Sequence, residues 1–211
     1  MSTQHQSSEA VLSLSHFQFF RRVVLGILII IAFMILLFVR SAGGQERHDL
    51  VEAIGLSLIV IGIVGRMWCT LYIGGRKSVE IVEFGPYSVT RNPLYVFSSI
   101  AAAGVGAQTG SLILTAFFFI ACAGAFHVVI RREERFLEGT FGETYRIYCS
   151  RVPRFWPAPR LYRDQATLTV STRRIYSTFG DGLIFFVAKP AFEAVEYFQD
   201  AGTIPIALLL F

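Results

Sequence analysis

Residues 93–130 read PLYVFSSIAAAGVGAQTGSLILTAFFFIACAGAFHVVI and contain no Asp, Glu, Lys or Arg. The polar residues 108–110 divide this stretch into two apolar arms. Residues 101–106 are nearly all Ala or Gly, and such small residues let two membrane helices approach closely. The stretch therefore predicts a helical hairpin in a membrane, with a short or tilted first arm and a second arm over residues 111–130.

Two more apolar runs precede the hairpin, Val23–Val39 and about Val51–Ile73. Both fall within the roughly 17–25 residues that a membrane-spanning helix needs. The whole chain is 54% hydrophobic and only 16% charged, whereas soluble domains carry about 25% charged residues. We therefore predict an all-α, polytopic membrane protein with about four to five transmembrane helices.

A single arginine, Arg66, interrupts the run Val51–Ile73. A guanidinium at that depth is costly unless it faces the bundle interior or a water-filled cavity. Alternatively, the long side chain of Arg66 snorkels to the membrane surface. The sequence leaves both positions open.

Positive charges gather at one set of ends of the predicted helices. They precede the first run, separate the second run from the hairpin and follow the hairpin, as Arg21, Arg22, Arg76, Lys77, Arg91, Arg131 and Arg132. By the positive-inside rule these segments face the cytosol. The sequence therefore predicts an integral, multi-pass membrane protein whose N-terminus, loop 74–92 and residues after 131 all lie on the cytosolic face.

The predicted organisation has three parts. Residues 1–22 form a polar N-terminal segment, residues 23–157 the membrane domain, and residues 158–211 a C-terminal extension. Charges interrupt the apolar stretches of this extension, so neither stretch can span a membrane alone. We expect amphipathic C-terminal helices here, including one at about Ile175–Phe198 that lies at the membrane surface or faces a partner.

Two classes of site find no support in the sequence. The chain has only two lysines and no basic stretch interleaved with aromatic residues, which argues against nucleic acid as a partner. Its four histidines are scattered, and its three cysteines are widely separated without a Cys-x-x-Cys pair, so no metal site is predicted. The oligomeric state is left open.

The segments that flank the hairpin carry polar residues on which a site could be built. The first is residues 79–95, VEIVEFGPYSVTRNPLY, in which Pro93 suits the first turn of a helix. Free backbone N–H groups at such a helix start can hold a carboxylate or a phosphate. On composition alone, however, the segment also fits a cytosolic loop without a site.

The second flanking segment is residues 131–148, RREERFLEGTFGETYRIY. It places a pair of carboxylates, Glu133 and Glu134, where the hairpin ends. The apolar spacing predicts an amphipathic helix over residues 133–148, with a break near Gly139 or Gly142. A belt of snorkelling side chains is the alternative interpretation.

Taken together, the two segments form the pattern G-x-Y-x-x-x-R-N-P-x-Y, then a hydrophobic hairpin, then E-E-x-x-L-x-x-x-F-G-x-x-Y-x-x-Y-x-x-x-V-P-R. This pattern covers about Val79–Pro157 and resembles the isoprenylcysteine carboxyl methyltransferase family and its phospholipid methyltransferase relatives. The resemblance implies an S-adenosyl-L-methionine-dependent methyltransferase. Its acceptor would be a lipid-like or prenylated molecule among the membrane lipids, with carboxylate O-methylation as in isoprenylcysteine carboxyl methyltransferases.

The resemblance also assigns residues to a cofactor pocket on the cytosolic face. Cofactor contacts are implied for Val79, Glu80, Ile81, Val82, Tyr87, Asn92, Pro93, Leu94, Tyr95 and Glu133. The implied catalytic residues are Glu133, Glu134 and Arg131. The chain departs from the family at Asn92, where His is usual, and at Val129, where an Arg would bind the substrate carboxylate. Arg131 is the nearest substitute for that Arg.

Two other functions remain open at this point. One is a membrane reductase of the sterol type, which carries a similar region but binds NADPH. The other is a catalytically inactive membrane adaptor on the same scaffold.

Overall fold

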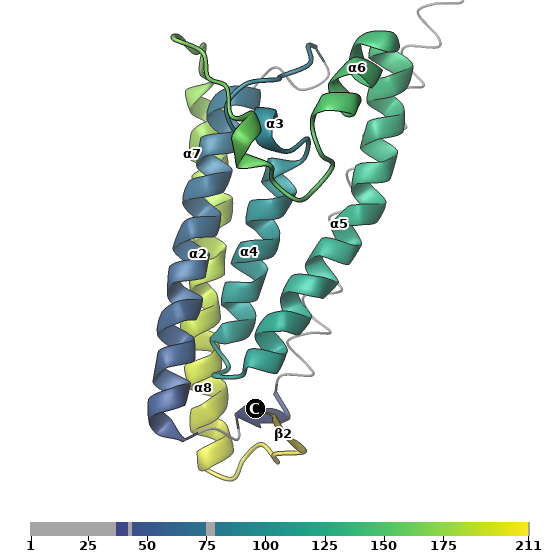
Figure 1. Ribbon diagram of the computed structural model, residues 1–211. Coiled ribbons are helices and arrows are strands. Elements are labelled where there is room, and N and C mark those ends of the chain that lie inside the picture. Colours follow the sequence, from purple (N-terminus) through teal and green to yellow (C-terminus); the bar gives the residue numbers. More distant parts are fainter. Residues whose placement is uncertain (1–36, 42–43, 75–78, 211) are drawn as a thin grey trace, which may run out of the picture.

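The computed structural model describes residues 37–41, 44–74 and 79–210, and these residues are mostly helical (Figure 1). The predicted helical class is therefore confirmed for the described part of the chain. In chain order the elements are β1 (Val39–Ser41), α2 (Gln45–Ile73), α3 (Pro86–Val89), α4 (Pro93–Ala107), α5 (Leu112–Phe141), α6 (Glu143–Arg151), the 3₁₀ turn η1 (Pro159–Leu161), α7 (Thr172–Leu183), the 3₁₀ turn η2 (Ile184–Val187), α8 (Ala188–Asp200) and β2 (Leu208–Leu210).

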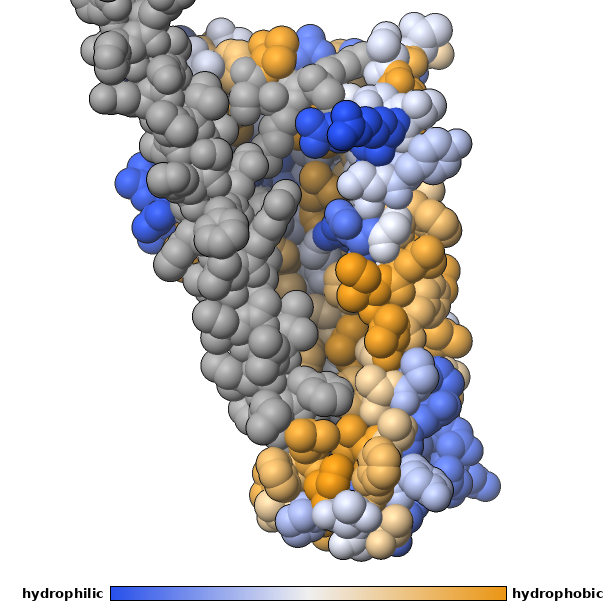
Figure 2. Space-filling view, turned by 180° about the vertical axis from the view of Figure 1, so that it is seen from behind, coloured by the Kyte–Doolittle hydropathy of each residue, from blue (hydrophilic) through white to orange (hydrophobic). Residues whose placement is uncertain are grey.

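Within the described ranges, α2 and α5 are long and apolar enough to cross a membrane. Many of their large apolar side chains are exposed, including Leu50, Val60, Val64, Ile120 and Val128. Figure 2 shows an apolar band along the right-hand side of the molecule, with hydrophilic residues above and below the band. Such a surface suits contact with lipid. The number of four to five spans stays a prediction, because most of the first predicted span, Val23–Val39, lies outside the described residues.

The helix α2 begins at Gln45 rather than at Val51, the predicted start of the apolar run. Residues 45–49 are polar, but Gln, Glu and Arg are good helix formers. Glu46 lies in the first turn, where a negative charge stabilises the helix dipole. The helix α2 therefore includes polar residues that precede the apolar run.

The hairpin has the predicted first arm, since α4 begins at Pro93 and ends just before Gln108. Gly110 adopts a positive φ of 69° in the connecting turn. The side chain of Ser111 then accepts a hydrogen bond from the backbone N–H of Leu114 and caps α5.

The second arm continues past its predicted end at Ile130, because α5 runs without interruption to Phe141. The predicted separate amphipathic helix over residues 133–148 is thus divided between α5 and α6. The division falls at Gly142, which has a φ of 54°, while Gly139 stays helical. Only a residue without a side chain adopts this backbone conformation readily, so Gly142 sets the end of α5.

The helices α2 and α4 pack side by side through small residues (Figure 1). A Cβ atom added to Gly62 would lie 2.6 Å from the Cβ of Ala101, and one added to Gly104 would lie 2.6 Å from the carbonyl oxygen of Gly55. The Gln108 side chain also donates a hydrogen bond of 3.1 Å to the carbonyl of Glu52. Glycine therefore sets the closest approach of the two helices.

The C-terminal extension runs along α2 as α7, η2 and α8 (Figure 1). The hydroxyls of Thr178 and Thr70 are 3.1 Å apart, and Lys189 Nζ lies 3.1 Å from Glu52 Oε2. The stretch expected to form one helix at about Ile175–Phe198 is helical, but it is divided into α7, η2 and α8, and it packs against the bundle.

Two short strands pair at the end of the bundle where α2 begins. β1 and β2 are parallel, with Val39 opposite Leu208. The last residue of the predicted first span, Val39, therefore lies in a strand and not in a helix. The apolar C-terminal residues satisfy part of their backbone hydrogen bonding in this pair.

The close contact at Gly62 can be tested by adding a side chain. Gly62→Val should lower the free energy of unfolding by about 1–3 kcal/mol, because the new side chain overlaps Ala101 and the Phe97 carbonyl. Gly124→Val is the matched control, since a Cβ on Gly124 in α5 meets no described atom within 4 Å. Unfolding by dodecyl sulfate in detergent micelles measures both. Equal midpoints for the two variants would contradict the packing described.

Candidate functional site

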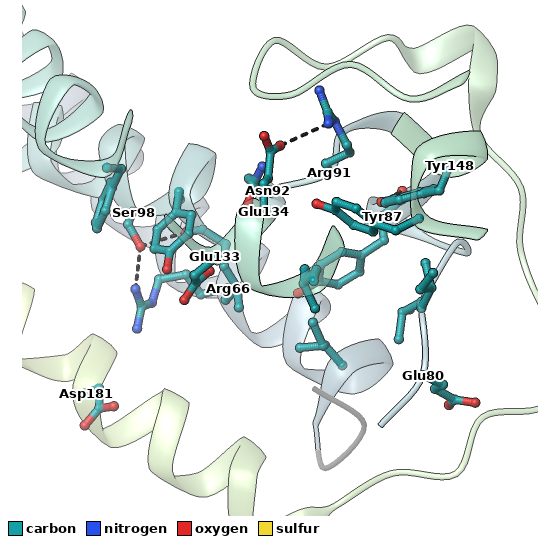
Figure 3. Close-up of a pocket in the computed structure, with 18 residues that line it drawn as sticks. Arg66, Glu80, Tyr87, Arg91, Asn92, Ser98, Glu133, Glu134, Tyr148 and Asp181 are labelled. Atoms are coloured by element: carbon teal, nitrogen blue, oxygen red, sulfur yellow. Dashed lines mark hydrogen bonds and ion pairs between the residues drawn. The ribbon is translucent and has the colours of Figure 1, made fainter. Parts of the chain in front are cut away.

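A cavity of about 410 Å³ lies where the two segments that flank the hairpin meet (Figure 3). Its volume is within the range of about 300–1,000 Å³ typical of small-molecule sites. Its walls come from α2, α4, α5, α6, α7 and the segment between α2 and α4. The lining residues are Arg66, Ile73, Glu80, Ile81, Val82, Tyr87, Arg91, Asn92, Leu94, Tyr95, Ser98, Phe126, Glu133, Glu134, Leu137, Tyr145, Tyr148 and Asp181.

The segment before α4 is held in place by a tight turn and by backbone hydrogen bonds to the chain after α6. Gly85 has a φ of 59° and lies against the ring of Tyr72, where a Cβ would be 2.3 Å from a ring carbon. The N–H of Arg91 donates to the carbonyl of Pro153 at 2.9 Å, and that of Ala158 donates to Val89 at 2.9 Å. These bonds fix the cavity wall without contributions from long side chains.

The carboxylate of Glu134 joins both flanking segments. One oxygen lies 3.1 Å from Arg91 Nη1, and the other accepts a hydrogen bond of 2.8 Å from Arg154 Nε. The Arg91 and Glu134 side chains are 12% and 11% exposed, so water screens this pair little, whereas Arg154 is 41% exposed. The hydrogen bond from Arg154 is charge-assisted, and such bonds are about twice as strong as neutral ones. Glu134 therefore attaches the end of α5 to the helix start of α4 and to the chain after α6.

Asn92 also joins the start of α4 to the chain after α6. Its side-chain amide donates a hydrogen bond of 2.9 Å to the carbonyl of Arg154, while the residue also lines the cavity. An amide does not titrate, so Asn92 orients the cavity wall without transferring protons.

Three buried tyrosines, Tyr87, Tyr145 and Tyr148, line the cavity. The Tyr148 hydroxyl donates a hydrogen bond of 2.8 Å to the carbonyl of Tyr87. Burial raises the pKa of the Tyr87 phenol well above its usual value, and it raises the pKa of Tyr145 and of Tyr148 as well. Because burial disfavours the phenolate, all three side chains stay neutral near pH 7. Their neutral rings can pack against a ligand, while the Tyr148 hydroxyl hydrogen is already donated to Tyr87.

Most of the residues expected in a cofactor pocket line this cavity, namely Glu80, Ile81, Val82, Tyr87, Asn92, Leu94, Tyr95, Glu133 and Glu134. Three expected residues do not. Val79 is 75% exposed. Pro93 points to the other side of α4, where it lines a separate apolar cavity with Trp68 and Phe97.

Arg131 is the third expected residue that lies outside the cavity. It is exposed, whereas its neighbour Ile130 is fully buried. Successive residues of a helix differ by about 100° in direction, so Ile130 and Glu134 share the inward face and Arg131 does not. Arg131 therefore does not replace the family's substrate arginine by position.

Five cavity residues come from parts of the chain that the motifs do not cover. They are Arg66 and Ile73 on α2, Ser98 on α4, Phe126 on α5 and Asp181 on α7. Arg66 donates a hydrogen bond to the Ser98 hydroxyl, and the rings of Tyr95 and Phe126 are 4.5 Å apart. The two positions left open for Arg66 are thereby resolved, since it lines the cavity between the helices. The charge of Arg66 within an apolar run was the sequence signal for it.

Comparison with known proteins identifies a family that this chain resembles and two relatives. The family model of phospholipid methyltransferases matches residues 51–144. The cobalt-zinc-cadmium resistance protein CzcN of Cupriavidus metallidurans is 37% identical over 173 residues, which cover 79% of this chain and 80% of that protein. The nickel-cobalt-cadmium resistance protein NccN of Alcaligenes xylosoxydans xylosoxydans is 34% identical over 196 residues, 91% and 92% of the two chains. No solved structure matches the chain.

The role of Glu134 in holding the site together can be tested against an exposed ion pair. Glu134→Gln should lower the free energy of unfolding by roughly 3 kcal/mol, since it leaves two arginines without their partner in a part-buried position. Glu138→Gln removes an exposed pair with Arg146 and should cost less than about 1 kcal/mol. Unfolding curves of the two purified variants in detergent micelles measure both losses of stability. A smaller loss for Glu134→Gln than for the control would refute the role.

Proposed function

Because this chain belongs to the phospholipid methyltransferase family, we propose that it is an S-adenosyl-L-methionine-dependent methyltransferase of the membrane. It transfers a methyl group to a lipid-like or prenylated acceptor. The observation that carries this proposal is the cavity itself, where residues of both flanking segments line one space of ligand size. The proposed site lies on the cytosolic face of a multi-pass protein.

The lining chemistry fits the proposed cofactor. S-adenosylmethionine, when bound, supplies an electrophilic methyl group on a sulfonium, and it also carries an ammonium and an adenine ring. Ile81, Val82 and Leu94 offer an apolar wall for a ring, while Glu80 and Glu133 offer negative charge for a cationic ligand. Glu134 forms ion pairs with Arg91 and Arg154 and so serves the structure of the cavity wall.

The residues of the cavity act by orientation in this proposal. Holding the acceptor at near-attack distance and excluding water can contribute roughly 7–11 kcal/mol to lowering a barrier. Glu133 contacts the cofactor, and Glu134 is a positioning residue that acts through Arg91 and Arg154. A carboxylate acceptor is ionised near neutral pH, so its methylation needs no general base.

The relatives are named for resistance to cobalt, zinc, nickel and cadmium. We propose that this chain contributes to metal resistance by methylating a component of the membrane.

The cofactor assignment is tested by binding. Glu133→Gln should raise the Kd of S-adenosylhomocysteine about tenfold or more, because a hydrogen bond to a charged group contributes roughly 1.5–3 kcal/mol. Arg131→Gln, which changes an exposed residue outside the cavity, should leave the Kd unchanged. Isothermal titration of the purified protein in detergent measures both. An unchanged Kd for Glu133→Gln removes Glu133 from the site, and binding of NADPH alone would favour a reductase.

The reaction is tested with S-adenosylmethionine labelled on the methyl group. Incubation of the purified protein with a lipid extract of its host should transfer the label to an extractable lipid, which mass spectrometry then identifies. Protein that binds the cofactor but labels nothing would favour an inactive adaptor.

The physiological proposal is tested in a bacterium that lacks its own relative of this protein. The wild-type chain should restore growth on cobalt or cadmium, whereas Glu133→Gln should not. Full restoration by Glu133→Gln would separate metal resistance from methyl transfer.

A further inference from the structure

The linker, residues 158–171, joins the end of the motif pattern at Pro157 to the start of α7 at Thr172. Apart from η1 this fully described segment has no regular structure, yet it passes beside α3 and makes specific hydrogen bonds to it (Figure 1). The motif resemblance ends at Pro157, and the family model ends at residue 144. The linker therefore belongs to a part of the chain to which neither assigns a role.

The backbone of Arg163 in the linker holds the turn at Gly85 through two hydrogen bonds. The N–H of Gly85 donates to the carbonyl of Arg163 at 2.7 Å, and the N–H of Arg163 donates to the hydroxyl oxygen of Ser88 at 2.9 Å. The Ser88 hydroxyl in turn donates to the carbonyl of Gly85 at 2.6 Å. Ser88 is fully buried, and a hydrogen bond in the protein interior is electrostatically stronger than one in water. The linker thus fixes the start of α3.

The side chain of Asp164 makes a second connection between the linker and the bundle. Its Oδ1 accepts a hydrogen bond of 2.6 Å from the Tyr72 hydroxyl, and its Oδ2 accepts one of 2.8 Å from the Tyr162 hydroxyl. The hydrogen bond from Tyr72, and next that from Tyr162, lower the pKa of the Asp164 carboxyl, so this group is ionised near pH 7. A hydrogen bond to an ionised acceptor is about twice as strong as a neutral one. Asp164 therefore fixes the end of the Tyr72 side chain.

The ring of Tyr72 extends this connection to the cavity wall. Gly85 lies directly against the ring, since a Cβ on Gly85 would be 2.3 Å from a ring carbon. Tyr72 is buried and packs in one apolar cluster with Tyr87, Val82 and Leu94. The last three residues all line the cavity, whereas Asp164 does not. The position of the Tyr72 ring therefore sets the position of a cavity wall that Asp164 itself does not reach.

We propose that Asp164 is a positioning residue for the cofactor, and that it acts through Tyr72 on the turn from Gly85 to Tyr87. This inference rests on the proposed methyltransferase function and adds to it a residue from outside the motifs. Asp164 contacts neither the cofactor nor the reacting atoms. Loss of its carboxylate releases the Tyr72 hydroxyl, lets the wall around Tyr87 shift and weakens cofactor binding, although every side chain of the cavity is still present. The linker is thus a working part of the cofactor site.

The proposal is tested by titrating S-adenosylhomocysteine into full-length protein in detergent. Asp164→Ala should raise the Kd about tenfold, because a binding site tolerates displacements of only about 0.5 Å in the residues that form it. Asp164→Asn keeps an acceptor oxygen for Tyr72 and should bind within about threefold of wild type. Asp49→Ala is the matched control at the other end of α2, where the carboxylate accepts an exposed hydrogen bond from Gln45, and it should leave the Kd unchanged. An unchanged Kd in Asp164→Ala would overturn the proposal.

A double-mutant cycle tests the route through Tyr72. Tyr72→Phe removes the hydroxyl but keeps the ring beside Gly85, and it should raise the Kd of S-adenosylhomocysteine several-fold. Adding Tyr72→Phe to Asp164→Ala should cause no further rise, because the two variants break the same hydrogen bond. Tyr162→Phe removes the other phenol, whose ring lies 6.1 Å from that of Trp68, and should change the Kd by less than about twofold. Additive effects of the two variants in the cycle would overturn the route.

Should Asp164→Ala fail to fold, Tyr72→Phe alone decides the question, since it removes a single oxygen and keeps the packing of the ring. A Kd equal to that of wild type would then overturn the proposal. Failure of S-adenosylhomocysteine to bind wild-type protein has a different meaning, because it would overturn the methyltransferase function itself. Binding to wild type together with an unchanged Kd in the variants overturns only the role of Asp164.

Discussion

The carboxylate of Glu134 forms a part-buried ion pair with Arg91 at one oxygen and accepts a hydrogen bond from Arg154 at the other. A charge in such a position is stable only when its partners are in place. This requirement draws together three parts of the chain that lie far apart in sequence, namely the end of α5, the start of α4 and the segment after α6. The hydrogen bond from Asn92 to the Arg154 carbonyl reinforces the same junction. The cavity exists because these parts meet.

Both signs of charge line the cavity. Figure 3 shows Glu133 beside Arg66, with Glu80 apart from them. The C-terminal extension takes part in this arrangement, because Asp181 of α7 reaches the cavity and α7 packs on α2 beside Thr70. The extension is thus part of the site's surroundings, although the family model ends at residue 144.

Local signals in the sequence were sufficient where they were strong. Pro93 and the polar residues 108–110 fixed both ends of α4 correctly. The change of composition at Arg131 was misleading, because Arg and Glu continue a helix as readily as Leu does, and only Gly142 interrupts it.

The site was less predictable, since its geometry depends on contacts between helices. The motifs led to most of the lining residues, but the direction of Arg131 follows from the helical phase set by buried Ile130. Arg66, Ser98 and Asp181 come from three different helices, and only tertiary packing brings them to one cavity.

The most direct test of the central claim is photolabelling of the purified protein with tritiated S-adenosylmethionine, followed by peptide mapping. The account predicts label within residues 79–95 or 133–148 that excess S-adenosylhomocysteine removes. Label confined to other peptides, or label that the competitor does not remove, would contradict it.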